Sequence, residues 1–134
     1  MDLKDSIAKD LIGKIDKERG FSRPWRKLLA DRDPQYMDFY HKNFMYVMGQ
    51  RNALPRKFKE IILVCLDAAT LYEPGFKIHV RGALEAGATE EEILEALEVT
   101  CLIGIHHLSG YLHLMCKEVD DFKRKRRIRN FHKT

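Results

Sequence analysis

The sequence predicts an all-α fold, a single-domain bundle of six or seven helices. Apolar side chains recur at spacings of three and four residues along most of the chain, which is typical of helices. No stretch shows the sustained alternation of apolar and polar residues, with hairpin turns, that indicates strands. Glycine and proline residues divide the chain into helix-length segments, and we detect no repeat or linker. Its 134 residues are enough for one domain with its own core.

Three predicted segments make up the first third of the chain. An amphipathic helix comes first and ends near Gly20, and a short helix or turn follows over residues 21–31. Asp33 and Pro34 predict the start of a third segment, a helix, because aspartate caps helix N-termini and proline suits the first turn. Aromatic and methionine side chains line this helix up to about residue 48.

The segment from Pro55 to Tyr72 predicts a helix that is apolar around nearly its whole circumference. Such a helix is typically buried on all sides, so we expect it at the centre of the fold. Its two carboxylates Glu60 and Asp67 stand seven residues apart, hence on nearly the same stripe. An unpaired buried carboxylate is costly, so a partner nearby is expected.

The next helix is predicted at Pro74–Ala86. Proline suits its first turn, and Gly87 is the left-handed residue expected after its last turn. Thr89, with Glu92 three residues later, predicts a capping box that starts another helix. That helix runs to about residue 103, and the last one covers residues 105–121 or continues into the C-terminal segment.

One face of the Pro74–Ala86 helix combines a histidine with very small residues. Gly75, His79, Gly82 and Ala83 lie on this face. Each glycine inside a helix costs about 1 kcal/mol relative to alanine, so the two glycines need a reason. A face this small lets another backbone approach closely, or leaves room for a ligand beside the imidazole.

The segment KIHVRGALEAGATEEEILEALEVTCLIGI, residues 77–105, resembles the carboxymuconolactone decarboxylase family, which also contains the alkylhydroperoxidase D-like proteins. The resemblance extends back through LPRKFKEIILVCLDAA and, more loosely, LLADRDPQYMDFYHKNF, and covers residues 24–116. It implies an alkylhydroperoxidase D-like helical fold, a homo-oligomer (trimer or hexamer) and chemistry without a cofactor. The redox branch of this family carries C-x-x-C ahead of the histidine, whereas this chain has Tyr72 and Gly75 there. The chain therefore resembles the non-redox branch.

In the family that the chain resembles, the positions of Glu60 and His79 line the active site. A carboxylate touching an imidazole fixes its tautomer and suits a proton-transfer pair. The resemblance thus implies that His79 is the catalytic acid and base and that Glu60 orients it. The same contact can also be a purely structural hydrogen bond. Asp67 is not part of the family pattern, and we expect it to pair helices.

Three further residues are candidates for substrate binding. Tyr72 stands where the redox branch has a cysteine, and it can donate a hydrogen bond into the site or pack at the helix end. Arg81 can hold a substrate carboxylate in a neighbouring subunit, or lie at the surface. His106, with His107 and His113, is predicted to line the pocket; their spacing is not a usual metal-ligand pattern, so no metal is expected.

Composition excludes several protein classes. No apolar run approaches the ~20 residues needed to span a bilayer, and the acid-rich N-terminal residues lack the apolar core of a secretory signal. Cys65, Cys101 and Cys116 are odd in number and lie in apolar helical sequence. This pattern indicates reduced, packed thiols of a cytoplasmic protein.

The positive charge of the chain is confined to its C-terminus. Residues 123–134 hold seven lysines and arginines and no acid, which leaves −3 on residues 1–122 out of a total of +4. We therefore divide the chain into a carboxymuconolactone decarboxylase-like domain, residues 1–122, and a basic tail, residues 123–134. Such a tail can bind nucleic acid or an anionic surface. A solvated end is favoured, because no nucleic-acid-reading motif accompanies it.

The resemblance implies a carboxymuconolactone decarboxylase-like lyase, which carries out cofactor-free decarboxylation or proton transfer on a lactone or an unsaturated carboxylic acid. The expected partner is then a small-molecule carboxylate or lactone. Two alternatives stay open. The chain can be a peroxide-related antioxidant protein, although it lacks the cysteine pair, or a non-catalytic oligomeric scaffold that presents its basic tail to an anionic partner.

Overall fold

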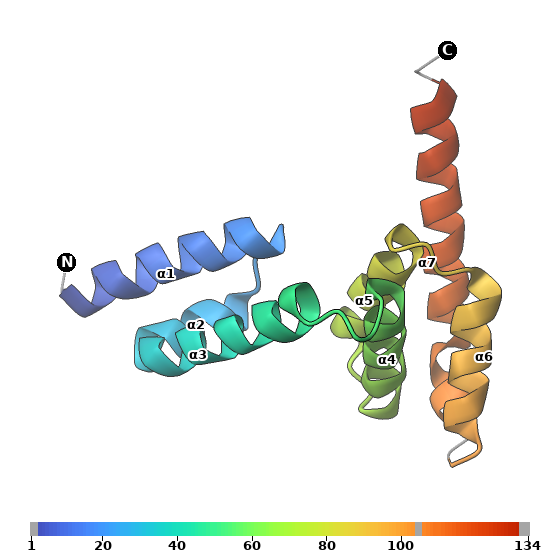
Figure 1. The fold of residues 1–134 in the computed structure, drawn as a ribbon, viewed down its shortest axis with the longest axis horizontal. Helices are drawn as coiled ribbons and strands as arrows, with labels where there is room; N and C mark the ends of the chain where they lie inside the picture. The colour runs from blue at the N-terminus through green and yellow to red at the C-terminus, as the bar shows by residue number, and fades with distance from the viewer. Residues whose placement is uncertain (1–2, 104–105, 132–134) are drawn as a thin grey trace. The chain divides into compact units, whose positions relative to one another are not determined.

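The computed structural model describes residues 3–103 and 106–131. In these ranges the chain forms seven α-helices and one π-helical turn, with no strand, so the all-α prediction is confirmed (Figure 1). The chain divides into two compact units, Met1–Arg51 and Asn52–Thr134, each with a hydrophobic cluster of its own. No helix in the described part of the chain is both long and apolar enough to cross a membrane.

The first unit consists of α1 (Leu3–Arg19), α2 (Pro24–Arg32), α3 (Pro34–Met45) and the π-helical turn η1 (Tyr46–Gln50). Gly20 ends α1 with a φ of +75°, in the left-handed region. Asp33 caps α3 as predicted, because its side chain accepts a hydrogen bond from the backbone N–H of Tyr36 at 2.9 Å. The three α-helices pack around a small core of Ala8, Ile15, Ala30 and Met37.

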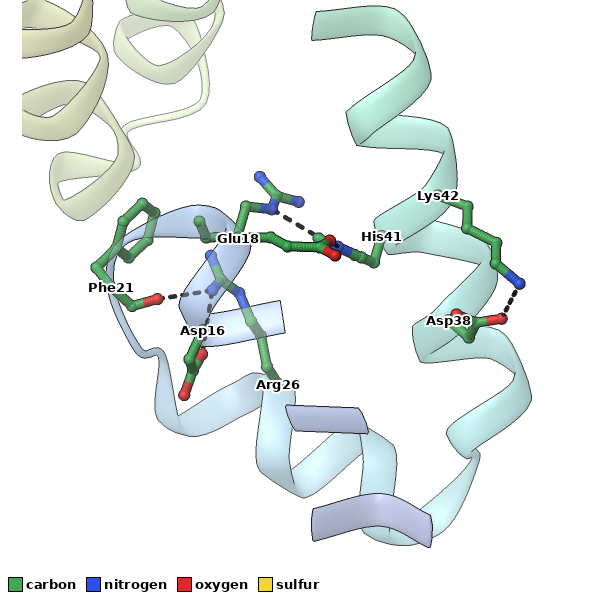
Figure 2. Close-up of polar contacts among 8 residues, drawn as sticks. Asp16, Glu18, Phe21, Arg26, Asp38, His41 and Lys42 are labelled. Carbon is green, nitrogen blue, oxygen red and sulfur yellow. Dashed lines mark hydrogen bonds and ion pairs between the residues drawn. The ribbon is translucent and has the colours of Figure 1, made fainter. Parts of the chain in front are cut away.

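A polar cluster in the first unit surrounds two buried side chains, Arg26 and His41 (Figure 2). Arg26 donates to the carbonyl oxygen of Phe21 at 3.0 Å and to Oδ1 of Asp16 at 3.5 Å. Nε2 of His41 lies 2.5 Å from Oε2 of Glu18. These contacts give α2 and α3 polar partners on α1 and on the loop that follows it, which offsets the cost of burying the two side chains.

The second unit consists of α4 (Arg56–Ala69), α5 (Glu73–Glu85), α6 (Glu90–Cys101) and α7 (His106–Phe131). α4 and α5 lie side by side and form the most extensive helix pair of the chain, and α6 packs against α4 and α7 (Figure 1). Phe76, Val80 and Ala83 of α5 are completely buried in this unit. The ring of Phe76 lies 4.9 Å from the ring of Tyr111 on α7. α5 packs against all three other helices of the unit, most extensively against α4.

α4 is not buried on every face, so the prediction that it is covered all round is wrong. Val64 and Ala68 face the core and are fully buried. On another face, Phe58, Ile62 and Leu66 are 42%, 46% and 54% exposed, at the spacing of one helical stripe. An apolar circumference predicts burial of every face only if other parts of the same chain pack against every face. No described part of the chain packs over this stripe.

Between α5 and α6, one helix ends and the next begins as predicted. Gly87 has a φ of +90°, a conformation that glycine adopts without strain. Oγ1 of Thr89 accepts a hydrogen bond from the backbone N–H of Glu92 at 3.1 Å, and Oε2 of Glu92 accepts one from the N–H of Thr89 at 2.9 Å. This reciprocal pair is a capping box, so the prediction is confirmed.

α7 extends beyond residue 121 and includes most of the basic segment. It runs to Phe131, so the boundary expected after residue 122 falls inside a helix. The basic side chains between residues 123 and 129 are exposed. Lys123 forms an ion pair with Glu90 at 2.8 Å, which attaches this part of α7 to the start of α6.

Candidate active site

Glu60 of α4 and His79 of α5 are in direct contact. Oε2 of Glu60 lies 2.7 Å from Nδ1 of His79, across the helix pair seen in Figure 1. The carboxylate is the buried member of the pair, because the side chain of Glu60 is 3% exposed and that of His79 is 18% exposed. The pair therefore presents the imidazole, and not the carboxylate, to the surroundings.

Glu60 is held in its ionised form by two partners. Its Oε1 accepts a hydrogen bond from Nε of Arg56, one helical turn earlier, at 2.6 Å, and forms an ion pair with Nη2 of the same arginine at 2.5 Å. Burial alone would raise the pKa of Glu60, but the hydrogen bonds from His79 and Arg56 outweigh burial and hold this pKa below its ordinary value. An ionised carboxylate only accepts hydrogen bonds, so Nδ1 of His79 donates to it. Nε2 is then the ring nitrogen able to exchange a proton.

The two glycines on this face of α5 make room for side chains. A Cβ atom at Gly82 would lie 2.8 Å from Cδ of Glu60 and 2.9 Å from its Oε2. A Cβ atom at Gly75 would lie 2.6 Å from Oδ2 of Asp67 and 2.6 Å from Cδ1 of Tyr72. Real contacts of this kind are not seen at such distances. The small face is therefore occupied by two carboxyl groups and a tyrosine ring, and not by another backbone.

Asp67 faces the second ring nitrogen of His79. Its Oδ2 lies 3.9 Å from Nε2, and among the described residues this buried oxygen has no hydrogen-bond partner. Burial raises the pKa of Asp67, and the nearby imidazole opposes this rise only in part. Asp67 does join α4 to α5, as expected of a helix-pairing residue, but it does so at the same imidazole as Glu60.

Residues 34–104, which include Glu60, Asp67 and His79, match the model of the carboxymuconolactone decarboxylase family. The chain belongs to this family. The match covers more than half of the sequence and confirms the resemblance drawn from the motif after His79. No match was found among curated proteins.

Two solved structures from Burkholderia xenovorans LB400 are similar to this member of the family. One is a candidate carboxymuconolactone decarboxylase with 24% identity and a TM-score of 0.73, covering 91% of this chain and 95% of the other. At that identity the likeness shows the fold alone. The other is a candidate γ-carboxymuconolactone decarboxylase subunit with 30% identity and a TM-score of 0.59. It covers 93% of this chain, which spans 48% of its length.

The thiols of this family member lie on other positions than those of the redox branch. Cys65 is half-buried on α4, and burial raises the pKa of its thiol. Cys101 is also half-buried, whereas Cys116 is exposed, so the prediction that all three thiols are packed is wrong for Cys116. A reactive thiol needs a low pKa, and Cys65 is shifted in the opposite direction.

The other predicted site residues are placed differently from Glu60 and His79. Tyr72 is the N-cap residue of α5, and its ring lies against Gly75 beside the Asp67 carboxyl group. Arg81 donates a hydrogen bond from Nε to the buried carboxylate of Glu118 on α7, so it is engaged away from the imidazole. The side chain of His106 lies outside the described residues, and the prediction for it stays a prediction.

Two other features of the second unit bear on ligand binding. In the described part of the chain, no group of three or more His, Cys, Asp or Glu side chains is placed to hold a metal ion. An open groove lies between the end of α5, the start of α6 and α7, and is lined by residues that include Leu84, Thr89, Phe122 and Arg126. None of Glu60, Asp67 and His79 lines this groove.

Sequence reasoning missed Arg56 as a partner of the site. The signal was present, because arginine and glutamate four residues apart on a helix are a common ion pair. It also assigned Asp67 only to helix pairing, although the seven-residue spacing from Glu60 put both carboxylates on one stripe. The shared stripe allowed both to reach one imidazole, which spacing along α4 alone does not reveal.

Proposed function

We propose that this protein is a cofactor-free enzyme that decarboxylates, or moves a proton on, a lactone or an unsaturated carboxylic acid. The observation that supports this most is the state of His79. Its Nδ1 is fixed by an ionised glutamate, and the ring is partly exposed. Family membership supports the reaction class, and the names of the two similar structures support the choice of substrate class.

The proposed decarboxylation requires one proton that can be transferred to the substrate. When the substrate loses CO₂, the bond between the carboxylate carbon and its neighbour breaks, and the electron pair moves into a conjugated carbonyl group. A proton must then be added to carbon. A positioned imidazole performs such transfers near neutral pH and typically contributes about 10²–10⁴-fold in rate. In this proposal His79 adds the proton through Nε2.

The remaining residues take supporting roles in the proposal. Glu60 orients His79 and stabilises the imidazolium form, because it bonds Nδ1 as a carboxylate. Tyr72, at the start of α5 beside Gly75, is the proposed donor to the oxygen on which negative charge develops. Arg81 bonds Glu118 of its own chain, and its expected role as a carboxylate anchor in a neighbouring subunit stays a prediction. The chemistry belongs to residues 1–122, and the basic segment 123–134 is not required for it.

We also propose that the enzyme acts as a homo-oligomer. The exposed stripe of Phe58, Ile62 and Leu66 on α4 supports this, since contiguous apolar surface of this kind is typical of protein–protein contacts. Light scattering coupled to size-exclusion chromatography should give a trimer or a hexamer, as the family resemblance implies. Ile62→Glu should shift the mass toward the monomer, while Lys125→Glu on the exposed end of α7 should not. A monomeric wild-type protein would contradict the proposal.

The function is tested with a panel of γ-lactones and β,γ-unsaturated carboxylic acids, including γ-carboxymuconolactone. CO₂ release and deuterium uptake from D₂O are the two readouts, because they report decarboxylation and proton transfer separately. We expect at least one compound to react, with the reaction lost in His79→Gln. If no compound releases CO₂ or takes up deuterium in a way that depends on His79, the proposed function is wrong.

A further inference from the structure

The polar group opposite Nε2 of His79 is a second carboxyl group. Oδ2 of Asp67 lies 3.9 Å from Nε2, and the side chain of Asp67 is 17% exposed. Among the described residues this oxygen is buried and accepts no hydrogen bond. A buried carboxyl oxygen without a donor is costly, so its position beside an imidazole nitrogen needs an explanation.

The hydrogen bond between Glu60 and Nδ1 of His79 determines how many protons the Asp67–His79 pair can hold. Ionised Glu60 takes the hydrogen on Nδ1, so a neutral His79 presents a lone pair at Nε2. A lone pair facing an ionised Asp67 is repulsive. One proton on either Nε2 or Oδ2 removes this repulsion. Two protons would place two donors against each other.

We propose that Asp67 and His79 share one proton, which is carried either on Oδ2 or on Nε2, and that this proton is the one delivered to the substrate carbon. The delivery step rests on the proposed function. Asp67 is then a positioning residue, which keeps a proton available to His79. The step balances: the carboxylate carbon leaves as CO₂, the electron pair left behind forms a C–H bond with the proton from Nε2, and water restores the proton to the pair.

The surroundings of the pair favour a retained proton. Burial raises the pKa of Asp67, so this carboxyl group keeps its proton to higher pH than an exposed aspartate. On the α7 side, burial and the charges of Glu73 and Asp67 raise the pKa of Tyr111, so this phenol stays neutral. On the α4 side, Arg56 pairs with Glu60 and helps to keep this carboxylate ionised.

Gly75 explains why this arrangement is possible in this chain. Any Cβ atom at residue 75 would lie 2.6 Å from Oδ2 of Asp67 and 2.8 Å from its Cγ. A side chain at position 75 would therefore have to displace the Asp67 carboxyl group. The absence of a side chain there leaves the space that this carboxyl group occupies near Nε2 of His79.

The shared proton is tested in the resting protein by NMR, without a substrate. The carboxyl ¹³C signal of Asp67 and the ring ¹⁵Nε2 signal of His79 are followed through a pH titration. We expect both signals to move in one transition with the same midpoint, as coupled groups do. In Asp67→Asn the ¹⁵Nε2 signal should no longer move at that midpoint, because the second group of the pair is removed; in Asp120→Asn, which changes an exposed aspartate of α7, it should still do so. Independent transitions for Asp67 and His79 in the wild type would overturn the proposal.

Delivery of the proton is tested by kinetics on the compound that the panel identifies. Asp67→Asn should lower kcat on the order of 10²-fold, the low end of what a general acid contributes, with little change in KM. Its pH profile should lose the limb that the shared proton produces, which a merely structural role would not change. Wild-type kcat in Asp67→Asn would refute the delivery while leaving the proposed function intact. Joint titration in a protein that turns over no compound would do the reverse.

Discussion

His41 in the first unit and His79 in the second each contact a glutamate, but the buried member differs. In the first unit the side chain of His41 is 2% exposed and that of Glu18 is 37% exposed. Figure 2 shows the two side chains pointing toward each other, from α3 and from the end of α1. In the second unit the glutamate is buried and the histidine is partly open. The first pair points its carboxylate outward, and the second points its imidazole outward.

The second ring nitrogen separates the two pairs further. Nδ1 of His41 accepts a hydrogen bond from Nε of Arg19 at 3.4 Å, so Nε2 carries the hydrogen that Glu18 accepts at 2.5 Å. Both nitrogens of His41 are thus occupied inside the protein. Nε2 of His79 instead faces Asp67 across 3.9 Å. A histidine–glutamate contact is therefore not by itself a catalytic sign; what matters is whether a ring nitrogen remains able to exchange a proton.

The largest expected effect comes from exchanging the two histidines for glutamine. His79→Gln should lower turnover by about 10²–10⁴-fold, because it removes the acid and base. His41→Gln should leave turnover unchanged and lower the free energy of unfolding by about 1–3 kcal/mol, because buried partners lose their hydrogen bonds. Steady-state assays and urea unfolding measure the two effects. Equal loss of turnover in both variants, with both folded, would remove the distinction between the pairs.

The glutamates should differ next, in the pH dependence of stability. The pKa of Glu60 is lowered in the folded protein, so its stabilisation is present above the unfolded-state pKa and is lost as the pH falls through the lowered value. Glu60→Gln should therefore cost about 2–3 kcal/mol at neutral pH, from hydrogen bonds to charged partners, and progressively less in acid.

Glu18→Gln is the matched control for this titration. The hydrogen bond with His41 lowers the pKa of Glu18 as well, but this carboxylate is partly exposed to water, which weakens the effect. Urea unfolding at a series of pH values should show a smaller change in the acid limb for this variant than for Glu60→Gln. The reverse order would mean that burial of Glu60 contributes nothing to its pairing.

Glycine-to-alanine substitutions should have opposite effects on stability at a crowded position and at an open one. Gly82→Ala must displace the Glu60 carboxylate, whose Cδ would be 2.8 Å away, and break its bonds to His79 and Arg56. We expect a net loss of about 1–2 kcal/mol despite the better helix propensity of alanine. Gly13→Ala in α1 meets nothing within 4 Å and should gain about 0.5–1 kcal/mol. Thermal unfolding of both variants tests the contrast, and stabilisation by Gly82→Ala would show that Glu60 is free to move.

Much of the fold could be predicted because its signals are local. The Asp33 cap, the Gly87 stop and the Thr89–Glu92 capping box each depend on residues within a few positions, and the structure has them as predicted. The exposure of the apolar stripe on α4 depends on whether other segments pack over it. The periodicity of apolar residues within one helix does not reveal this. The Glu60–His79 contact was expected through the family motif, since nineteen residues separate the two.

The His41–Glu18 pair was missed for the same physical reason. Twenty-three residues separate its members, and a lone histidine among the aromatic residues of α3 gives no sign of its partner. Asp67 was assigned to helix pairing because its distance to Nε2 is a property of the packed helices. Contacts of this range become visible only once helices are placed beside each other, whereas caps and stops are visible in the sequence.

The smallest expected effect is a difference in stability between variants of the two carboxylates of the site, Asp67 and Glu60. Because burial raises the pKa of Asp67, its contribution to stability is fully present below the unfolded-state pKa and is lost as the pH rises through the folded-state value. Asp67→Asn should therefore be slightly more stable than the wild type at neutral pH and no more stable in acid, opposite in sign to Glu60→Gln. Urea unfolding at both pH values measures this. A destabilised Asp67→Asn at neutral pH would mean that Asp67 is an ordinary ion-pair partner of His79, because only then does its charge stabilise the folded chain.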